Sequence, residues 1–198
     1  FKKIQSLEDS HWRKIKLREV KSILQNCLGL RLQFNTNQPT GVANTNVSIN
    51  LKAINPSPLA VTISRIEGAT SLVVNQKLTS NDAWEKRQTL RLPNIQTTPY
   101  WLLEKGDMGN YKVSNEALKG LPETPNSIQA RFHLIVEGTP LQLDIPLSFR
   151  TTDRVAGEVV EDFQLVPKIT TQLDESVVFF NDDSTQKIRL FVRAHTSN

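Results

Sequence analysis

Residues 128–149 read IQARFHLIVEGTPLQLDIPLSF and contain two segments in which apolar and polar residues alternate. The first segment covers residues 128–136 and the second covers residues 141–149. An alternation with a period of two places every apolar side chain of a strand on the same face of a sheet. The stretch therefore predicts two neighbouring strands, each with one face in a hydrophobic core.

The short connection between these strands predicts how they pair. Gly138-Thr139 fits the two central positions of a type II′ turn, which has glycine first. Pro146 lacks a backbone N–H, so it predicts an edge position or a bulge in the second strand. The turn predicts that Val136 pairs with Leu141, Leu134 with Leu143, and Phe132 with Ile145.

Shorter alternating segments occur before and after this hairpin, with turn residues between them. A polar stretch, residues 35–46, is predicted to be a loop. Many short strands at this spacing are typical of a β-sandwich, so we predict a mainly β, immunoglobulin-like antiparallel β-sandwich. The other predicted strands cover residues 30–34, 47–53, 61–66, 72–78, 84–92 and 159–166.

A single amphipathic helix is predicted before the first strand. Ser6 or Ser10 can cap its N-terminus, and Gly29 can end it in the left-handed conformation. Trp12 and Cys27 fall on its apolar stripe, so we expect Cys27 to be a buried small hydrophobe. The other members of the stripe are Val20, Ile23 and Leu24.

These patterns divide the chain into three parts. Residues 1–29 form a linker helix and residues 30–167 form the β-sandwich domain, with Pro167 at its border. Residues 168–198 are predicted to form a β-hairpin, with strands over 169–180 and 188–194 and a turn at 181–184. This hairpin is a candidate start of a second sandwich.

Composition and charge argue against two classes of partner. No apolar run approaches the ~20 residues of a membrane-spanning helix. The net charge is +4, but the positive residues cluster only around the predicted helix, so we expect no nucleic-acid partner. The chain begins at Phe1 rather than Met, which fits a processed or excised piece and leaves the compartment open. The clustered cations are Lys14, Lys16, Arg18 and Lys21.

One connection, residues 97–113, is rich in aromatic residues and unlike a strand. Connections are mostly polar, so these side chains either plug the sandwich or form a binding surface. Trp84 on a nearby strand joins the candidates for a sugar-binding or domain-docking surface. The candidate aromatic residues are Trp84, Tyr100, Trp101 and Tyr111, with Glu104, Lys105, Asp107 and Asn110 as neighbouring polar groups.

Several motifs around this connection carry a family resemblance. They are Pro99-Tyr100-Trp101-Leu102, Gly109-Asn110-Tyr111-Lys112-Val113, Pro122-Glu123-Thr124-Pro125, Phe149-Arg150-Thr151-Thr152-Asp153, Gly157-Glu158, residues 163–167, and a helix over residues 16–30 that ends in Gly29-Leu30. Together they resemble the non-catalytic region that follows the catalytic domain in Bacteroidetes-type PIG-L (LmbE-like) deacetylases. The resemblance covers the chain from about residue 5 to its end.

The resemblance implies a zinc-dependent catalytic domain elsewhere in the same polypeptide. That family's signature is a His-Pro-Asp-Asp run with a later His-x-x-His pair, and neither occurs in this sequence. His11, His133 and His195 are far apart in the sequence, and alternation places His133 on the outward face of its strand. Cys27 has no predicted base partner. We therefore expect no catalytic, cofactor or metal-ligating residue in this chain.

Two functions from different classes remain open. The resemblance implies an accessory region that supports or targets a domain removing acetyl groups from N-acetylglucosamine-type substrates, in the periplasm or at the cell surface. The alternative is an independent carbohydrate-binding or cell-surface adhesion module, with glycans as partners. Docking predicts that Trp12 and the aromatic residues of 97–113 form one apolar patch at a single end, whereas a sugar module predicts aromatic faces and polar groups in one groove.

Overall fold

The computed structural model describes residues 1–175, 177–179, 185 and 187–196, and it confirms a mainly β chain with one main helix. Its contacts divide the chain into two compact units. Unit 1 comprises Phe1–Pro39, Val47–Leu90 and Pro125–Phe163. Unit 2 comprises Thr40–Asn46, Arg91–Thr124 and Gln164–Asn198. The helix therefore groups with the sandwich strands, and residues 91–124 group with the C-terminal strands.

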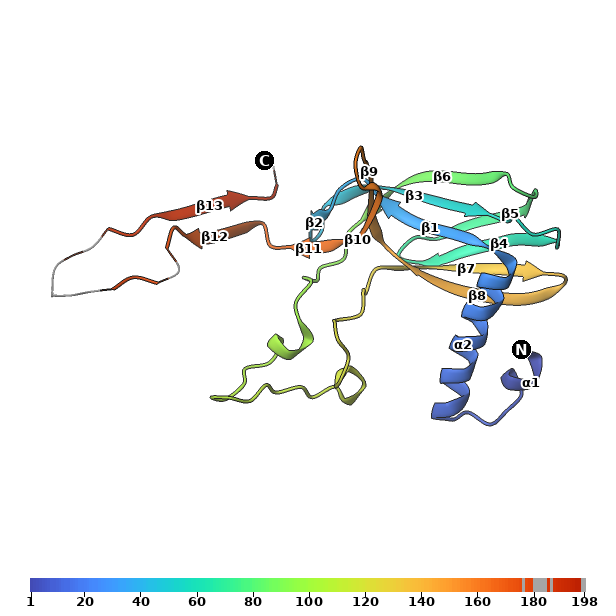
Figure 1. The fold of residues 1–198 in the computed structure, drawn as a ribbon, viewed down its shortest axis with the longest axis horizontal. Helices are drawn as coiled ribbons and strands as arrows, with labels where there is room; N and C mark the ends of the chain where they lie inside the picture. Colours follow the sequence, from blue (N-terminus) through green and yellow to red (C-terminus); the bar gives the residue numbers. More distant parts are fainter. Residues whose placement is uncertain (176, 180–184, 186, 197–198) are drawn as a thin grey trace. The chain divides into compact units, whose positions relative to one another are not determined.

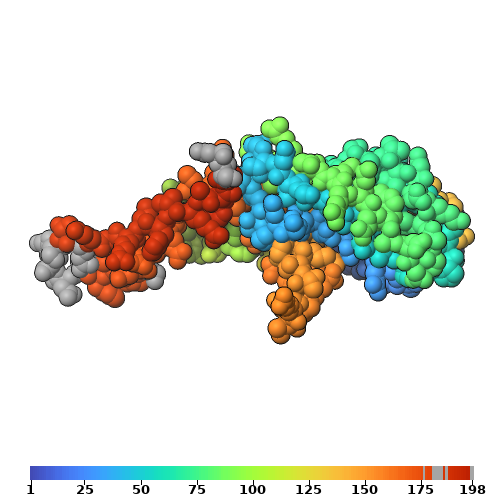
Figure 2. Space-filling view, turned by 90° about the horizontal axis from the view of Figure 1, so that it is seen from above, coloured from blue at the N-terminus to red at the C-terminus, as the bar shows by residue number. Residues whose placement is uncertain are grey.

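Unit 1 contains a five-stranded sheet in the order β10-β9-β1-β3-β6 (Figure 1). The β1–β3 and β9–β10 pairs are antiparallel, as expected for the predicted sandwich, whereas β1 and β9 pair in parallel. In Figure 2 the β9–β10 hairpin (orange) projects beside β1 (blue). The strands are β1 (Arg31–Thr36), β3 (Asn46–Ile54), β6 (Ala83–Arg91), β9 (Ser148–Asp153) and β10 (Gly157–Asp162).

The second sheet of unit 1 has four antiparallel strands in the order β5-β4-β7-β8. A register shift in β4 between Ile63 and Arg65 lets both Ile63 and Ile66 face the interior. The strands are β4 (Val61–Gly68), β5 (Leu72–Leu78), β7 (Gln129–Val136) and β8 (Thr139–Pro146).

The core lies between these two sheets, as expected for a β-sandwich. Strand β3 alternates buried and more exposed positions along its whole length, which is the pattern that the sequence predicted. The largest buried side chains come from both sheets, and each is less than 2 % exposed. They include Phe34, Ile49 and Leu51 from the first sheet and Ile63, Ile66 and Phe132 from the second.

The predicted hairpin exists, but its predicted register is wrong by two residues. Leu134 pairs with Leu141 and Phe132 with Leu143, because Glu137-Gly138 forms the turn. Both turn residues have positive φ, 45° and 73°, which is the signature of a type I′ turn rather than II′. The backbone N–H and a carboxylate oxygen of Glu137 bond to Ala60, which holds this unusual conformation.

The predicted strand over residues 141–149 is in fact two strands in different sheets. Strand β8 ends at Pro146, on the edge of the four-stranded sheet, as a proline without an N–H allows. Leu147 is fully buried, and Ser148 begins β9 in the other sheet. The uninterrupted alternation hid this crossing because the apolar residues on both sides of Pro146 point into the same core.

Helix α2 (His11–Leu28) matches the predicted helix, and the short helix α1 (Lys2–Gln5) precedes it. Ser10 is the N-cap, with its hydroxyl accepting from the Arg13 N–H at 3.2 Å, and Gly29 ends the helix at φ 62°. The expectation of a buried Cys27 is wrong, because Cys27 is exposed. Leu28 is the one buried residue of the helix.

Unit 2 contains two small sheets and a long connection. Strand β2 (Thr40–Val42) pairs in parallel with β11 (Gln164–Val166), although residues 35–46 were predicted to be a loop. Strands β12 (Ile169–Leu173) and β13 (Leu190–Ala194) form an antiparallel hairpin, as predicted but with shorter strands. The predicted turn at 181–184 and the strand end at residue 180 lie outside the described residues. None of the helices in the described part of the chain is long and apolar enough to cross a membrane.

Candidate functional site

Tyr100 lies in a 3-10 turn, η1 (Tyr100–Leu102), and is buried inside unit 2. Its hydroxyl donates to the Leu121 carbonyl at 2.9 Å, and its backbone N–H donates to the Thr124 hydroxyl at 2.8 Å. The Trp101 ring meets the Tyr100 ring edge-on, with centroids 4.9 Å apart. Tyr100 therefore holds the connection together rather than offering its ring to a ligand.

The later part of the connection exposes its large side chains. Tyr111 is 70 % exposed and Met108 is fully exposed, whereas Leu102 and Leu103 are more than half exposed. Leu102 ends η1, and the other three residues lie in the loop that follows it. The loop therefore presents isolated apolar side chains instead of a stacked aromatic platform.

The polar residues predicted to surround the aromatics mostly stabilise the loop itself. Both carboxylate oxygens of Glu104 accept from Ser114, one from its hydroxyl at 2.7 Å and one from its N–H at 2.8 Å. These bonds hold the pKa of Glu104 below its ordinary value. Asp107 and Asn110 exchange two backbone hydrogen bonds in a tight turn, whereas Lys105 is exposed.

Trp84 does not belong to the same unit as the other candidate aromatics. It lies half-buried on β6 in unit 1, whereas Tyr100, Trp101 and Tyr111 lie in unit 2. The four residues therefore form no cluster within either unit.

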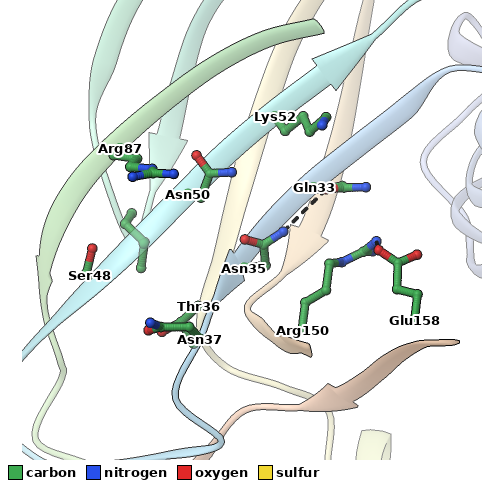
Figure 3. A pocket seen from close by; sticks show the side chains of 11 residues that line it. Gln33, Asn35, Thr36, Asn37, Ser48, Asn50, Lys52, Arg87, Arg150 and Glu158 are labelled. Atoms are coloured by element: carbon green, nitrogen blue, oxygen red, sulfur yellow. Dashed lines mark hydrogen bonds and ion pairs between the residues drawn. The ribbon is translucent and has the colours of Figure 1, made fainter. Parts of the chain in front are cut away.

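A different site lies on the outer face of the five-stranded sheet, entirely within unit 1 (Figure 3). It is an open hollow of about 460 Å³, within the size range of small-molecule sites. All five strands of the sheet contribute side chains to it, as Figure 3 shows for the residues spaced along β1 and β3. Its lining contains the four amides Gln33, Asn35, Asn37 and Asn50.

The charged groups of this hollow are mostly positive. Lys52, Arg87 and Arg150 line it, against the single carboxylate of Glu158. Arg150 pairs with Glu158, and Lys52 pairs with Glu85 at 2.7 Å. Arg87 has no ion-pair partner among the residues that the structure describes, so the hollow has one uncompensated guanidinium.

Two buried polar atoms of the hollow lack a hydrogen-bond partner in the described structure. They are the side-chain oxygen Oδ1 of Asn50 and the nitrogen Nε of Arg150. Buried polar side-chain atoms in folded proteins are mostly hydrogen-bonded. Asn35, itself 9 % exposed, donates to Gln33 Oε1 at 3.3 Å and so fixes one wall of the hollow.

The sequence pattern did not predict this hollow, although the sequence contains a signal for it. Alternation places Ser48, Asn50 and Lys52 on the outward face of a predicted strand, and Gln33 on that of another. Amides on outward positions are ordinary, and only the strand order brings them beside Arg87 and Arg150. Because β9 joins the sheet through a parallel pairing that local periodicity does not predict, the site could not be assembled from the sequence.

The histidines occupy separate places. His133 is on the face of β7 opposite Phe132, the outward face that alternation predicted, yet its side chain is only 8 % exposed. Its Nε2 lies 2.8 Å from a carboxylate oxygen of Glu67. In the part of the chain that the structure describes, no group of three or more His, Cys, Asp or Glu side chains could hold a metal ion.

Comparisons with known proteins give little further guidance. No family model and no curated protein sequence matches the chain. A structural search finds the Pseudomonas fluorescens alkylpurine DNA glycosylase AlkC bound to DNA containing an abasic site analog, at 10% sequence identity and a TM-score of 0.23. The match covers 60% of this chain and 30% of that protein, and at this TM-score it indicates neither fold nor function.

Proposed function

We propose that this chain is a non-catalytic β-sandwich region of a PIG-L-type deacetylase, and that helix α2 packs against the catalytic domain of the same polypeptide. The observation that carries the proposal is the uncovered apolar surface of α2. Of its 18 residues only Leu28 is buried, whereas Trp12 is 67 % exposed and Ile23 is 57 % exposed.

A helix with this exposure is incompletely stabilised by its own unit. Helices in proteins obtain most of their stability from packing of an apolar face. Beside α2 lies an apolar hollow of about 480 Å³, lined by Leu24 and Leu28 of the helix and by Val136 and Leu141 of the β7–β8 hairpin. An apolar surface of a neighbouring domain would bury the exposed helix side chains Trp12 and Ile23.

The family resemblance implies different roles for the catalytic domain and for the sandwich. A catalytic domain of the resembled family would bind zinc and remove the acetyl group from an N-acetylglucosamine-type substrate. Helix α2 would fix the orientation of the sandwich relative to that domain, and the sandwich would support or target it. Periplasmic or cell-surface location belongs to the same proposal.

The first test concerns the sequence of the polypeptide that contains this chain. The proposal expects a His-Pro-Asp-Asp run in a domain before α2. A polypeptide that has residues before α2 but no such run would contradict the deacetylase assignment.

The second test replaces the exposed apolar residues of α2 in that polypeptide. The double variant Trp12→Ser/Ile23→Ser should become more sensitive to limited proteolysis between the domains, because an apolar contact is lost. Arg18→Ser is the control, since Arg18 is exposed on the same helix but is not apolar. Equal cleavage of the double variant and the control would argue against docking through α2.

The alternative of an independent carbohydrate-binding module is favoured by a different observation. The polar hollow on the five-stranded sheet offers amide and guanidinium groups suited to hydroxyl and carboxylate ligands. The candidate aromatic residues do not line it. A glycan site in this chain would therefore lie on the sheet rather than on the aromatic connection.

A further inference from the structure

We propose that the hollow on the outer face of the five-stranded sheet binds a carboxylate-bearing saccharide. Nothing in this inference depends on the deacetylase proposal, because the site lies within unit 1 and uses none of the exposed residues of α2. Arg87, Arg150 and Asn50 are the residues expected to contact the ligand.

The unmet hydrogen bonds of the hollow define what a ligand must supply. Asn50 Oδ1 is buried and accepts from no described group, so a ligand hydroxyl can donate to it once the Asn50 side chain turns toward the hollow. Arg150 Nε is buried and donates to no described group, so a ligand oxygen can accept from it once the Arg150 side chain shifts. A ligand that carries both donors and acceptors on a compact frame meets both requirements, and a sugar ring with several hydroxyls has this property.

The charge of the hollow selects an acidic ligand. Of the three cations of the lining, Arg150 forms an ion pair with Glu158, which also lines the hollow. Lys52 forms an ion pair with Glu85, which lies outside the lining. The remaining guanidinium, Arg87, projects from β6 on the same side of the sheet as Asn50 (Figure 3). A guanidinium presents paired N–H donors that match the two oxygens of a carboxylate.

The lining also argues against two other anionic ligands. It contains no aromatic ring on which a base could stack, whereas proteins that bind single-stranded nucleic acids commonly use such stacking. It contains one aliphatic residue, Ile49, which is 1 % exposed, so it offers little surface to a fatty acid. Free phosphate shares the charge of the proposed ligand but has no ring hydroxyls for the amides of the lining.

Calorimetric titration of this chain with three probes tests the proposal. The probes are a trigalacturonate, its methyl ester and inorganic phosphate. The ester keeps the ring hydroxyls of the trigalacturonate but has no charge. The proposal expects the trigalacturonate to bind, and its affinity to fall as salt is added. It expects the ester and phosphate each to bind at least about tenfold more weakly, because each lacks one of the two features that the hollow recognises.

Variants place the binding in the hollow. Arg87→Gln should weaken trigalacturonate binding by about tenfold or more, because a charge-assisted hydrogen bond is lost. Lys86→Gln removes the same charge from the neighbouring position of β6, outside the hollow, and should leave the affinity unchanged. Both residues are exposed, so neither change is expected to unfold the sheet.

Three results would overturn the proposal. Absence of trigalacturonate binding would remove the saccharide site. If the ester bound as tightly as the trigalacturonate, the carboxylate would not be recognised. If phosphate bound as tightly as the trigalacturonate, the sugar ring would not be recognised. Equal weakening by Arg87→Gln and Lys86→Gln would show general attraction to a basic protein instead of a site.

Discussion

Two tyrosines of the same connection differ in burial. Tyr100 is 9 % exposed and its hydroxyl is bonded to the Leu121 carbonyl, whereas Tyr111 is 70 % exposed. The sequence correctly marks the stretch as unusual, but composition cannot tell a buried ring from a presented one. The difference arises from the 3-10 turn at Tyr100, which directs that ring inward.

The Glu104–Ser114 interaction predicts a dependence of this loop on pH. The pKa of Glu104 is lowered in the folded state by hydrogen bonds from the Ser114 side chain and then from its N–H. The stabilisation is therefore present above the ordinary pKa near 4.5 and is lost as the pH falls through the lower, folded-state pKa. Protonation removes the charge that these two donors favour.

NMR titration of the Ser114 amide measures this effect directly. The amide signal should shift with a midpoint below 4.5, and Glu104→Gln should abolish that titration. Ser114→Ala keeps the backbone donor, so its midpoint should lie between the folded wild-type value and the ordinary one. A wild-type midpoint at or above 4.5 would contradict the geometry.

The polar hollow shows the limit of residue-level prediction. Its amides occupy outward positions of strands that the sequence predicted correctly, yet outward amides are common and carry no signal alone. Arg150 reaches them only because β9 pairs in parallel with β1, from residues more than a hundred positions away. Local sequence contains no information on that pairing.

At the scale of elements, most strands could be predicted from alternating apolar and polar residues between turn residues, and in β3 this alternation matches the burial pattern. Strands β3, β5 and β6 fall close to their predicted bounds, since alternation and turn residues agree there. The hairpin register could not be predicted, because it depends on Glu137 adopting a positive φ that its bonds to Ala60 maintain. The division of residues 141–149 into two strands at Leu147 could not be predicted either, because the apolar residues of both strands face the same core.

A glycine at the end of β4 gives a prediction for this element. Gly68 has φ +105°, and a Cβ placed on it would lie 2.6 Å from the Gln129 carbonyl oxygen of β7. Gly68→Ala should therefore combine backbone strain of about 1–3 kcal/mol with displacement of a paired strand. The free energy of unfolding, measured by chemical denaturation, should fall by more than the strain alone.

Gly138→Ala is the matched control for this prediction. Gly138 lies in the same sheet's β7–β8 turn at φ +73°, and a Cβ there would meet nothing within 4 Å. Gly138→Ala should add backbone strain without any steric clash. Its free energy of unfolding should therefore fall less than that of Gly68→Ala. A smaller loss for Gly68→Ala would show that β4 and β7 are not as closely placed as the structure indicates.

At the scale of the whole molecule, the division into units differs from the division that the sequence suggested. Sequence boundaries were set at residues 29 and 167, where periodicity changes and where a proline interrupts the chain. Contacts instead group α2 with the sandwich and place the aromatic connection with β11, β12 and β13. Thr97 explains part of this grouping, because its N–H and hydroxyl both bond to Leu165 at 2.9 Å.

The accessory role proposed for this chain depends on a helix that its own unit leaves largely uncovered. If α2 is completed by a catalytic domain, its stability should rise when that domain is present. Local opening free energy follows the packing of an element, so backbone hydrogen exchange reports the difference. The helix ends are well defined by Ser10 and Gly29, so the change should concern the interior of the helix.

Hydrogen exchange of the amides of His11–Leu28, measured in this chain alone and in the polypeptide that contains it, is the most direct test. We expect rapid exchange in this chain alone and clear protection in the longer polypeptide that the proposal implies. Strands β3 and β7 should be equally protected in both and serve as the internal control. Equal exchange of α2 in the two proteins would contradict the claim that this helix docks on a catalytic domain.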